Sequence, residues 1–168
     1  MLSRNFDILT PMSKVHRISR TIWKRQTFGA EPGMWVALVK DVASGYVPGS
    51  VTKVDDTNAS NVFALCINYC IPADQPISTY EANDTKIGRI STIEEPGIRC
   101  QMSTGLFVTG STLHIGTKLY VSKAINSVGM LTNLCAIGDI AVARVESISG
   151  SDIEIKTIDQ VAATVAVV

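Results

Sequence analysis

The stretch ARVESISGSDIEIKTI, residues 143–158, decides the fold class of this chain. Two runs rich in β-branched residues flank a Gly-Ser pair, and a short Gly-containing connection between such runs is typical of a β-hairpin. The alternation predicts two antiparallel strands, with one face toward a core and the other toward solvent. The predicted core residues are Val145, Ile148, Ile153, Ile155 and Ile158, and the predicted solvent residues are Arg144, Glu146, Glu154 and Lys156. Because the spacing from Val145 to Ile148 breaks strict alternation, we expect a β-bulge there.

Outside this hairpin, the chain from Gly33 onward repeats the same pattern of short apolar runs bounded by Gly, Pro, Asn and Asp. The runs recur at intervals of about ten residues and no long helical window interrupts them, which is typical of all-β sandwiches and barrels. We therefore expect an all-β fold: a single compact antiparallel β-barrel or sandwich, preceded by an extended N-terminal arm. The remaining runs are MWVALVKDV (34–42), GYVPGSVTKV (45–54), NVFALCINYC (61–70), TKIGRIST (85–92), GIRCQMSTGLFVTG (97–110), TKLYVSKA (117–124), GMLTN (129–133) and VAATVAVV (161–168).

Three segments follow from this pattern: a basic arm over 1–30, a β domain over 31–160 and an apolar C-terminal strand or tail over 161–168. VAATVAVV carries no charged side chain and has strong β character, so as an open edge it would be an aggregation hazard. We expect it to pair within its own subunit, with strand addition to a neighbour as the alternative. The loop-like stretch 71–84, which contains two prolines, is a candidate projection toward a partner.

Charge is unevenly distributed along the sequence. Six of the fifteen Lys and Arg residues fall within the first 28 positions, against the single acid Asp7, and the rest of the chain has nine basic and fourteen acidic residues. This split predicts an arm that contacts an acidic partner or nucleic acid. The candidate contact residues are Arg4, Lys14, Arg17, Arg20, Trp23, Lys24 and Arg25. An ordinary disordered terminus is the alternative for the isolated protein.

An acidic protein surface is the favoured partner of this arm, and it could belong to another copy of the chain or to a lattice of a different protein. Trp23 and Phe28 could stack on bases, but the acidic body has no RNA- or DNA-binding motif, so nucleic acid is disfavoured. Only 18% of the residues are charged, where about 25% is usual, and an oligomer that hides surface accounts for this better than a deep core does. We expect a homo-oligomer, with a trimer favoured and a dimer as the alternative.

No catalytic constellation is present, so the sequence predicts a protein that is not an enzyme and needs no cofactor. GxSxG, GxxxxGK[ST] and GxGxxG are absent. Adjacent strand residues point to opposite faces, so neither Asp55/Asp56 nor Glu94/Glu95 forms a convergent pair, and both segments resemble turns. A cation site at Asp55, Asp56 and Asn58 is a weak alternative because the loop lacks EF-hand spacing.

The four cysteines, Cys66, Cys70, Cys100 and Cys135, are expected to be buried reduced thiols. On a strand, Cys66 and Cys70 would lie about 13 Å apart, too far for a disulfide with each other. No CxxC pair with nearby His indicates zinc, and a disulfide that forms late is the alternative. The chain also has no apolar run of about eighteen residues and no secretory h-region, so we expect neither a membrane span nor secretion.

The segment from about Lys86 to Ile158 resembles the head decoration, or capsid cement, proteins of tailed bacteriophages. The resemblance consists of KIGRI, GTKLYVSKAINSVGMLTN, AIGDIAVARVESISG and SDIEIKTI, with matching residues at Gly116, Leu119, Tyr120, Val121, Gly129, Leu131, Thr132, Ile137 and Gly138. It implies a virion protein assembled in the host cytoplasm that binds the outer surface of the capsid and clamps neighbouring major capsid subunits.

Two other classes of function stay open. One is a different phage structural component, such as a neck, tail or fibre-base subunit. The other is a β-sandwich carbohydrate-binding module, which would require an exposed aromatic platform among Trp35, Tyr46, Tyr69 and Tyr80.

Overall fold

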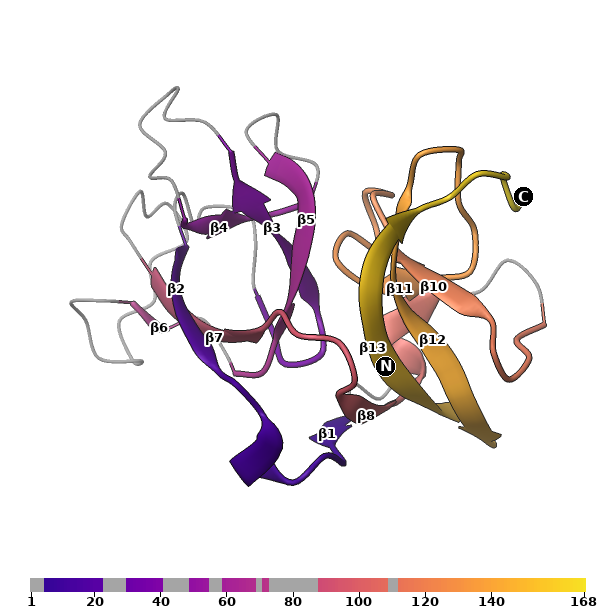
Figure 1. The fold of residues 1–168 in the computed structure, drawn as a ribbon, viewed down its shortest axis with the longest axis horizontal. Coiled ribbons are helices and arrows are strands. Elements are labelled where there is room, and N and C mark those ends of the chain that lie inside the picture. The colour runs from indigo at the N-terminus through magenta and orange to yellow at the C-terminus, as the bar shows by residue number, and fades with distance from the viewer. Residues whose placement is uncertain are drawn as a thin grey trace. The chain divides into compact units, whose positions relative to one another are not determined.

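The predicted all-β fold class is confirmed. The computed structural model describes residues 5–22, 30–40, 49–54, 59–68, 71–72, 88–108 and 112–168, and within these ranges strands are joined by turns and two short 3-10 helices, with no α-helix. The helices are η1 (Met12–Lys14) and η4 (Thr104–Leu106). The strands lie in two sheets (Figure 1), in which antiparallel pairings outnumber parallel ones.

The chain divides into two compact units. Unit 1 contains Met1–His16 and Glu95–Val168, and unit 2 contains Arg17–Glu94, so unit 2 is an insertion in the sequence of unit 1. Unit 1 has seven basic and seven acidic residues, and unit 2 has eight of each. The basic arm and the acidic body that were predicted from the sequence therefore do not correspond to the two compact units, because each unit carries equal numbers of basic and acidic residues.

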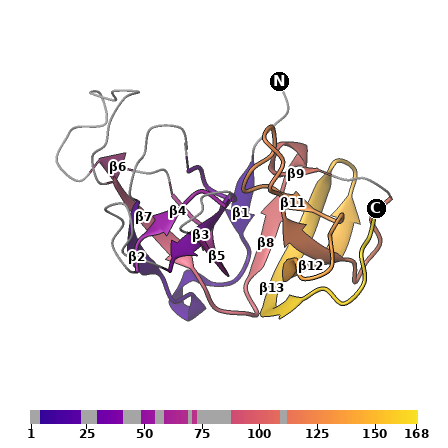
Figure 2. The ribbon, with the colours of Figure 1, turned by 90° about the horizontal axis from the view of Figure 1, so that it is seen from above.

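Unit 1 is built on a seven-stranded sheet with the order β1-β8-β13-β12-β10-β11-β9. Figure 2 shows β8, β13 and β12 as neighbours in the middle of this sheet. The only parallel pair in its described strands is β11 with β9. The bounds are β1 (Phe6–Ile8), β8 (Arg99–Met102), β9 (Phe107–Val108), β10 (Lys118–Val121), β11 (Leu131–Thr132), β12 (Ile140–Ser149) and β13 (Asp152–Ala162).

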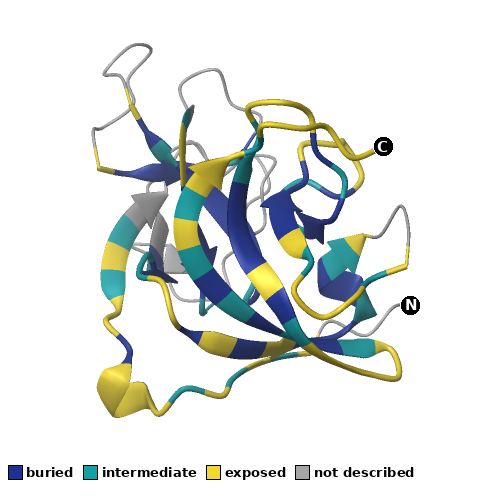
Figure 3. Ribbon diagram, turned by 45° about the vertical axis from the view of Figure 1, so that its right-hand side comes forward, coloured by how far each residue is buried: buried dark blue, intermediate teal, exposed yellow. Residues whose placement is uncertain are grey.

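The predicted hairpin is present as β12 and β13. Gly150 and Ser151 connect the strands, and Gly150 has φ +61°, a conformation that glycine adopts without steric cost. The register shifts between Val145 and Ser147, which confirms the predicted bulge and assigns Glu146 as the extra residue. Along β13, buried residues alternate with partly buried ones from Asp152 to Ile158 (Figure 3), whereas β12 has three consecutive buried residues, Ala141–Ala143, and ends in the exposed residues Ser147–Ser149.

The core prediction for this hairpin is confirmed at Val145, Ile153 and Ile155, which are buried, whereas Ile158 is only partly buried. The prediction is wrong for Ile148, which is exposed. Ile148 lies beyond the bulge and next to the turn, past the start of β10, which begins at Lys118 opposite Arg144; among the described residues only Ile153 on β13 therefore pairs with it.

The C-terminal tail pairs with its own unit. β13 continues through Val161 and Ala162 opposite Ala141 and Ile140, and Val167 forms an isolated antiparallel bridge with Cys135. The expectation of intramolecular pairing is therefore confirmed.

Unit 2 contains the second sheet, with the order β2-β4-β3-β5-β7-β6. β2 pairs with β7 over five residues and with β4 through Ile22 and Val51, so the sheet curls on itself. Side chains of β3, β5 and β7 fill its core, including Trp35, Leu65 and Ile93. The bounds are β2 (Ile18–Ile22), β3 (Trp35–Val39), β4 (Val51–Thr52), β5 (Ala59–Cys66), β6 (Ile71–Pro72) and β7 (Gly88–Ile93).

The N-terminal segment is extended, as predicted, but two parts of it are strands of these sheets. β1 pairs with β8 in unit 1, and β2 pairs with β7 in unit 2. An extended segment exposes a backbone donor and acceptor at each residue, and pairing with a sheet edge satisfies them. The segment is thus held by its own chain at Phe6–Ile8 and Ile18–Ile22. Apart from Ile71 and Pro72, the predicted 71–84 loop lies outside the described residues.

No helix in the described part of the chain is long and apolar enough to cross a membrane.

Candidate partner-binding surfaces

Arg20, one of the predicted arm contacts, is engaged inside unit 2. Its Nε and Nη2 donate to the two carboxylate oxygens of Glu94 at 2.7 and 2.8 Å, and its Nη1 donates to the carbonyl oxygen of Gly49 at 3.0 Å. The hydrogen bond to Glu94 raises the pKa of Arg20, against the opposing effect of burial. A bidentate pair of this kind is a specific, strong interaction, so Arg20 anchors β2 to its own unit.

Lys14 and Arg17 are the predicted arm contacts that the structure leaves exposed. Lys14 ends η1, and Arg17 precedes β2. Arg4, Trp23, Lys24 and Arg25 lie outside the described residues. Partner binding by the arm residues stays a prediction, which now concerns mainly Lys14 and Arg17 in the described part of the chain.

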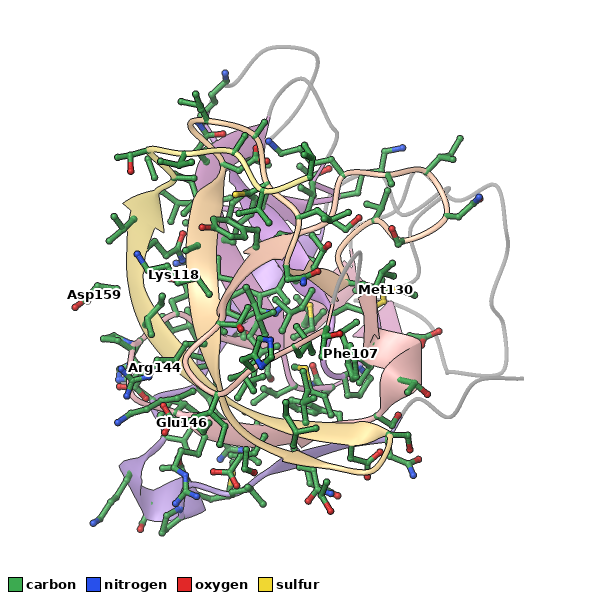
Figure 4. The ribbon with its side chains drawn as sticks, turned by 90° about the vertical axis from the view of Figure 1, so that its right-hand side faces the viewer. Phe107, Lys118, Met130, Arg144, Glu146 and Asp159 are labelled. Carbon is green, nitrogen blue, oxygen red and sulfur yellow. The ribbon has the colours of Figure 1, made fainter. Side chains whose placement is uncertain are left out.

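A row of four basic residues crosses the sheet of unit 1. Lys118 on β10 is opposite Arg144 on β12, Arg144 is opposite Lys156 on β13, and Lys156 is opposite Arg99 on β8. Directly opposed residues share one face of a sheet, about 5 Å apart, so the four cations lie side by side. We call Lys118, Arg144, Lys156 and Arg99 the basic row. Figure 4 shows Lys118 and Arg144 on one side of the view, with Phe107 and Met130 on the other.

Two glutamates neutralise only half of the basic row. Arg144 Nε donates to Glu146 at 2.5 Å, and Arg99 Nε donates to Glu154 at 2.6 Å. The hydrogen bond from Arg144 lowers the pKa of Glu146, and the charges of Lys156 and Arg99 act in the same direction. Among the described residues, the ammonium groups of Lys118 and Lys156 form no ion pair. Like charges directly opposite each other destabilise a sheet, so the row costs folding stability.

Two of the four residues of the basic row were predicted to face solvent, but the row itself was not predicted. Alternation in the hairpin placed Arg144 and Lys156 on the solvent face, and both lie there. Lys118 and Arg99 belong to other strands, and only the register of β10 and β8 against the hairpin aligns them with this pair. Strand register between distant segments has no local signal, which is why the row could not be predicted.

A cleft of about 560 Å³ lies beside the C-terminal tail in unit 1. Its walls are mainly aliphatic, from Val108, Val121, Leu134, Val167 and Val168. The hydroxyls of Ser122 and Ser127 also line it and are 2.7 Å apart, so they satisfy each other. We call this the C-terminal cleft.

At the edge of the C-terminal cleft, Lys123 Nζ donates to Asp139 at 3.0 Å. Desolvation raises the pKa of Asp139, but the backbone N–H of Ala136 and the ammonium of Lys123 outweigh it, so the net shift is downward. The ion pair leaves the side chains that line the cleft without net charge.

The buried thiols do not form a reactive site. Cys66, Cys100 and Cys135 are buried and free, as predicted for the cysteines, while Cys70 lies outside the described residues. Burial raises the pKa of Cys100 to about 12. Burial, together with a hydrogen bond to Cys135, raises the pKa of Tyr120 to about 12. A thiol held protonated by burial, as at Cys100, is a poor nucleophile at neutral pH.

Other candidate chemistry receives no support from the described residues. No three His, Cys, Asp or Glu side chains within them are placed to hold a metal ion. Asp55, Asp56 and Asn58 lie outside them, as do Tyr46, Tyr69 and Tyr80. Trp35 is 2% exposed, so it cannot contribute to a surface aromatic platform.

Glu94 and Glu95 do not act as a carboxylate pair. Glu94 holds Arg20 in unit 2, while Glu95 accepts the backbone N–H of His16 in unit 1 at 2.6 Å. The predicted turn after Glu95 is present at Pro96 and Gly97, where Gly97 has φ +90°.

Comparison with known proteins gave no matching family model, no matching curated protein and no matching solved structure.

Proposed function

We propose that this chain is a non-enzymatic structural protein of a phage virion, which binds the outer surface of the capsid and clamps neighbouring major capsid subunits. The resemblance between Lys86 and Ile158 motivates the choice of a capsid. The observation that carries the proposal is the basic row of unit 1, because it places four cationic side chains next to one another across adjacent strands of one sheet.

The basic row is a feature that costs stability in the free protein. Three successive like-charge pairs oppose sheet formation, and Lys118 and Lys156 form no ion pair within the described residues. Departures of this kind from local consistency are expected at functional sites. Carboxylates from a partner would neutralise Lys118 and Lys156, so binding would relieve the repulsion.

An acidic protein surface fits the basic row better than nucleic acid does. Nucleic-acid-binding domains usually spread positive charge over a whole face, whereas unit 1 carries as many acidic as basic residues. Glu146 and Glu154 lie within the row itself and would repel a continuous phosphate backbone. A protein lattice can place its carboxylates at Lys118 and Lys156 alone. Exposed Lys14 and Arg17 would add further contacts to the same lattice.

The test is cosedimentation of the full chain with empty shells of the phage whose genome encodes it, with the double variant Lys118→Glu/Lys156→Glu as the probe. Reversing two charges should lower shell occupancy at least about tenfold in 0.1 M salt, because each glutamate would repel the acidic surface that the lysine attracts. The matched control is Lys40→Glu/Lys53→Glu in unit 2, which introduces the same charge change and should leave occupancy unchanged.

Three results would contradict the proposal. The first is a wild-type chain that does not sediment with shells at low salt. The second is equal binding by both double variants. The third is binding to single-stranded DNA at the affinity measured for shells, which would indicate a nucleic-acid-binding protein.

A further inference from the structure

We infer that the face around the C-terminal cleft is an interface with a second copy of this chain, formed by antiparallel pairing of the two C-terminal tails. This interface is separate from the basic row and does not depend on the capsid proposal. The side chains around the cleft give the first indication of it.

Large aliphatic side chains at and beside the C-terminal cleft are exposed to solvent. Val168 is fully exposed and Ile125 is 91% exposed. Ile137 and Val165 are more than two-thirds exposed, and each directly adjoins a residue that lines the cleft. Several exposed aliphatic side chains at and beside an apolar cleft are typical of an interaction site. A small apolar ligand could fill the cleft but would leave these outer residues in water.

The tail also presents an open strand edge. Val167 uses both its N–H and its C=O on Cys135, at 2.9 and 3.0 Å, so its neighbours in the tail face the other way. The backbone groups of Ala166 and Val168 form no hydrogen bond in the described part of the chain. An uncharged edge without proline is suited to the addition of another strand.

Charge and sequence together favour a second copy as the added strand. In a two-fold interface each group meets its own equivalent, so a face with net charge would repel itself. The charged residues lining the cleft, Lys123 and Asp139, neutralise each other at 3.0 Å. Residues 161–168, VAATVAVV, have no charged side chain and include β-branched residues that favour strand pairing. Two such tails can therefore pair without an unmatched charged side chain.

The experiment is sedimentation velocity of the full chain over a concentration series, compared with Val165→Lys and Ile115→Lys. We expect the wild-type chain to associate to twice its 18.0 kDa mass. Val165→Lys should weaken this association at least about tenfold, because a second copy would bury the added charge. Ile115→Lys is the matched control, because Ile115 is about as exposed as Val165 but, unlike Val165, does not adjoin a residue that lines the cleft. Ile115 precedes the first residue of β10, whereas the cleft is lined by Val121 at the opposite end of that strand.

Because Val165 and Ile115 are both exposed, neither variant should unfold the protein, and circular dichroism verifies this. Equal association of all three proteins would overturn the proposal, and so would a wild-type chain that stays monomeric up to about millimolar concentration. A monomer that binds the apolar dye ANS in the cleft would instead indicate a small-ligand site. Failure here leaves the shell-binding test intact, because that test alters different residues.

Discussion

The described parts of the two units differ in the side chains that they expose. Of the twelve large hydrophobic side chains that are exposed among the described residues, eleven belong to unit 1 and only Val62 belongs to unit 2. Unit 2 uses its Arg20–Glu94 ion pair internally, with both side chains about one-fifth exposed, whereas Arg99, Lys123 and Arg144 of unit 1 pair with acids at the surface.

This difference indicates that the two units have different roles, although both consist mainly of β-strands. The described part of unit 2 buries most of its large apolar side chains and pairs Arg20 with Glu94 internally, although the buried Trp35 Nε1 has no hydrogen-bond partner among the described residues; these are mostly the features of a scaffold. Unit 1 leaves aliphatic side chains and cations unsatisfied, which is the behaviour of a surface that meets partners. Both proposed surfaces lie in unit 1, and substitutions in the two units test how far this separation holds.

The largest expected effects are on the two cores. Ile155→Ala in unit 1 and Leu65→Ala in unit 2 each remove a fully buried side chain and should each lower the free energy of unfolding by about 2–5 kcal/mol. Hydrogen exchange measured by mass spectrometry should then rise mainly in β8, β12 and β13 for Ile155→Ala, and mainly in β3 and β5 for Leu65→Ala. A uniform rise across both units with either variant would show that the units do not have separate stabilities.

A smaller difference is expected between the ion pairs of the two units. Glu94→Gln removes the charge that holds Arg20 in a partly buried site and should cost about 1–3 kcal/mol in urea unfolding. Asp139→Asn in unit 1 affects the exposed Lys123 pair and should cost less than about 1 kcal/mol. Equal costs would remove the distinction between internal and surface ion pairs.

Gly150→Ala should lower the free energy of unfolding by about 1 kcal/mol, because of the backbone conformation at this position. A Cβ at this position would meet nothing within 4 Å, so the penalty of Gly150→Ala arises from φ +61° alone. Gly150→Asn should recover part of the loss, because Asn tolerates this conformation. In unit 2, Gly49→Ala should cost a similar amount, since Gly49 has φ +81° and its added Cβ would make only an ordinary van der Waals contact with Arg20 Nη1 at 3.6 Å. Urea midpoints of the three variants would decide the order.

The smallest effect near neutral pH concerns the buried titratable groups of unit 1. Cys100 and Tyr120 have their pKa values raised to about 12 from 9.0 and 10.0, so the folded state holds these protons more tightly than the unfolded state. Their contribution to stability is therefore complete below pH 9 and is lost as the pH rises toward 12. Urea unfolding at pH 7, 9 and 11 should show a decline only in the last step. Tyr120→Phe should reduce that decline, and an unchanged decline would refute the role of Tyr120.

The part of the fold that is local in sequence could be predicted. The β12–β13 hairpin, its bulge and the turn at Pro96 and Gly97 all depend on residues within a few positions of one another. The tail was also predictable, because an uncharged apolar strand has to pair somewhere. Ile148 was not, since its exposure depends on where the neighbouring strand β10 begins, at Lys118 opposite Arg144.

The pairing of the N-terminal segment could not be predicted, for a different reason. β1 has only three residues, and its partner β8 begins at Arg99, so no periodicity links the two. Counting charge along the sequence grouped Lys14, Arg17 and Arg20 as one arm, although Arg20 already has an acidic partner at Glu94. The basic row was missed because alternation identifies a face but not the alignment of neighbouring strands.

The insertion of unit 2 within unit 1 sets an order of events during synthesis. All the strands of unit 2 have been made once Ile93 is in place, so that unit can fold while the rest of the chain is still being translated. β1 has to wait for β8, which at about 5–20 residues per second is a delay on the order of ten seconds. Throughout this delay the nascent chain carries the unpaired strand β1 ahead of the folded unit 2. A ribosome-associated chaperone that binds unpaired strands would act mainly at this stage.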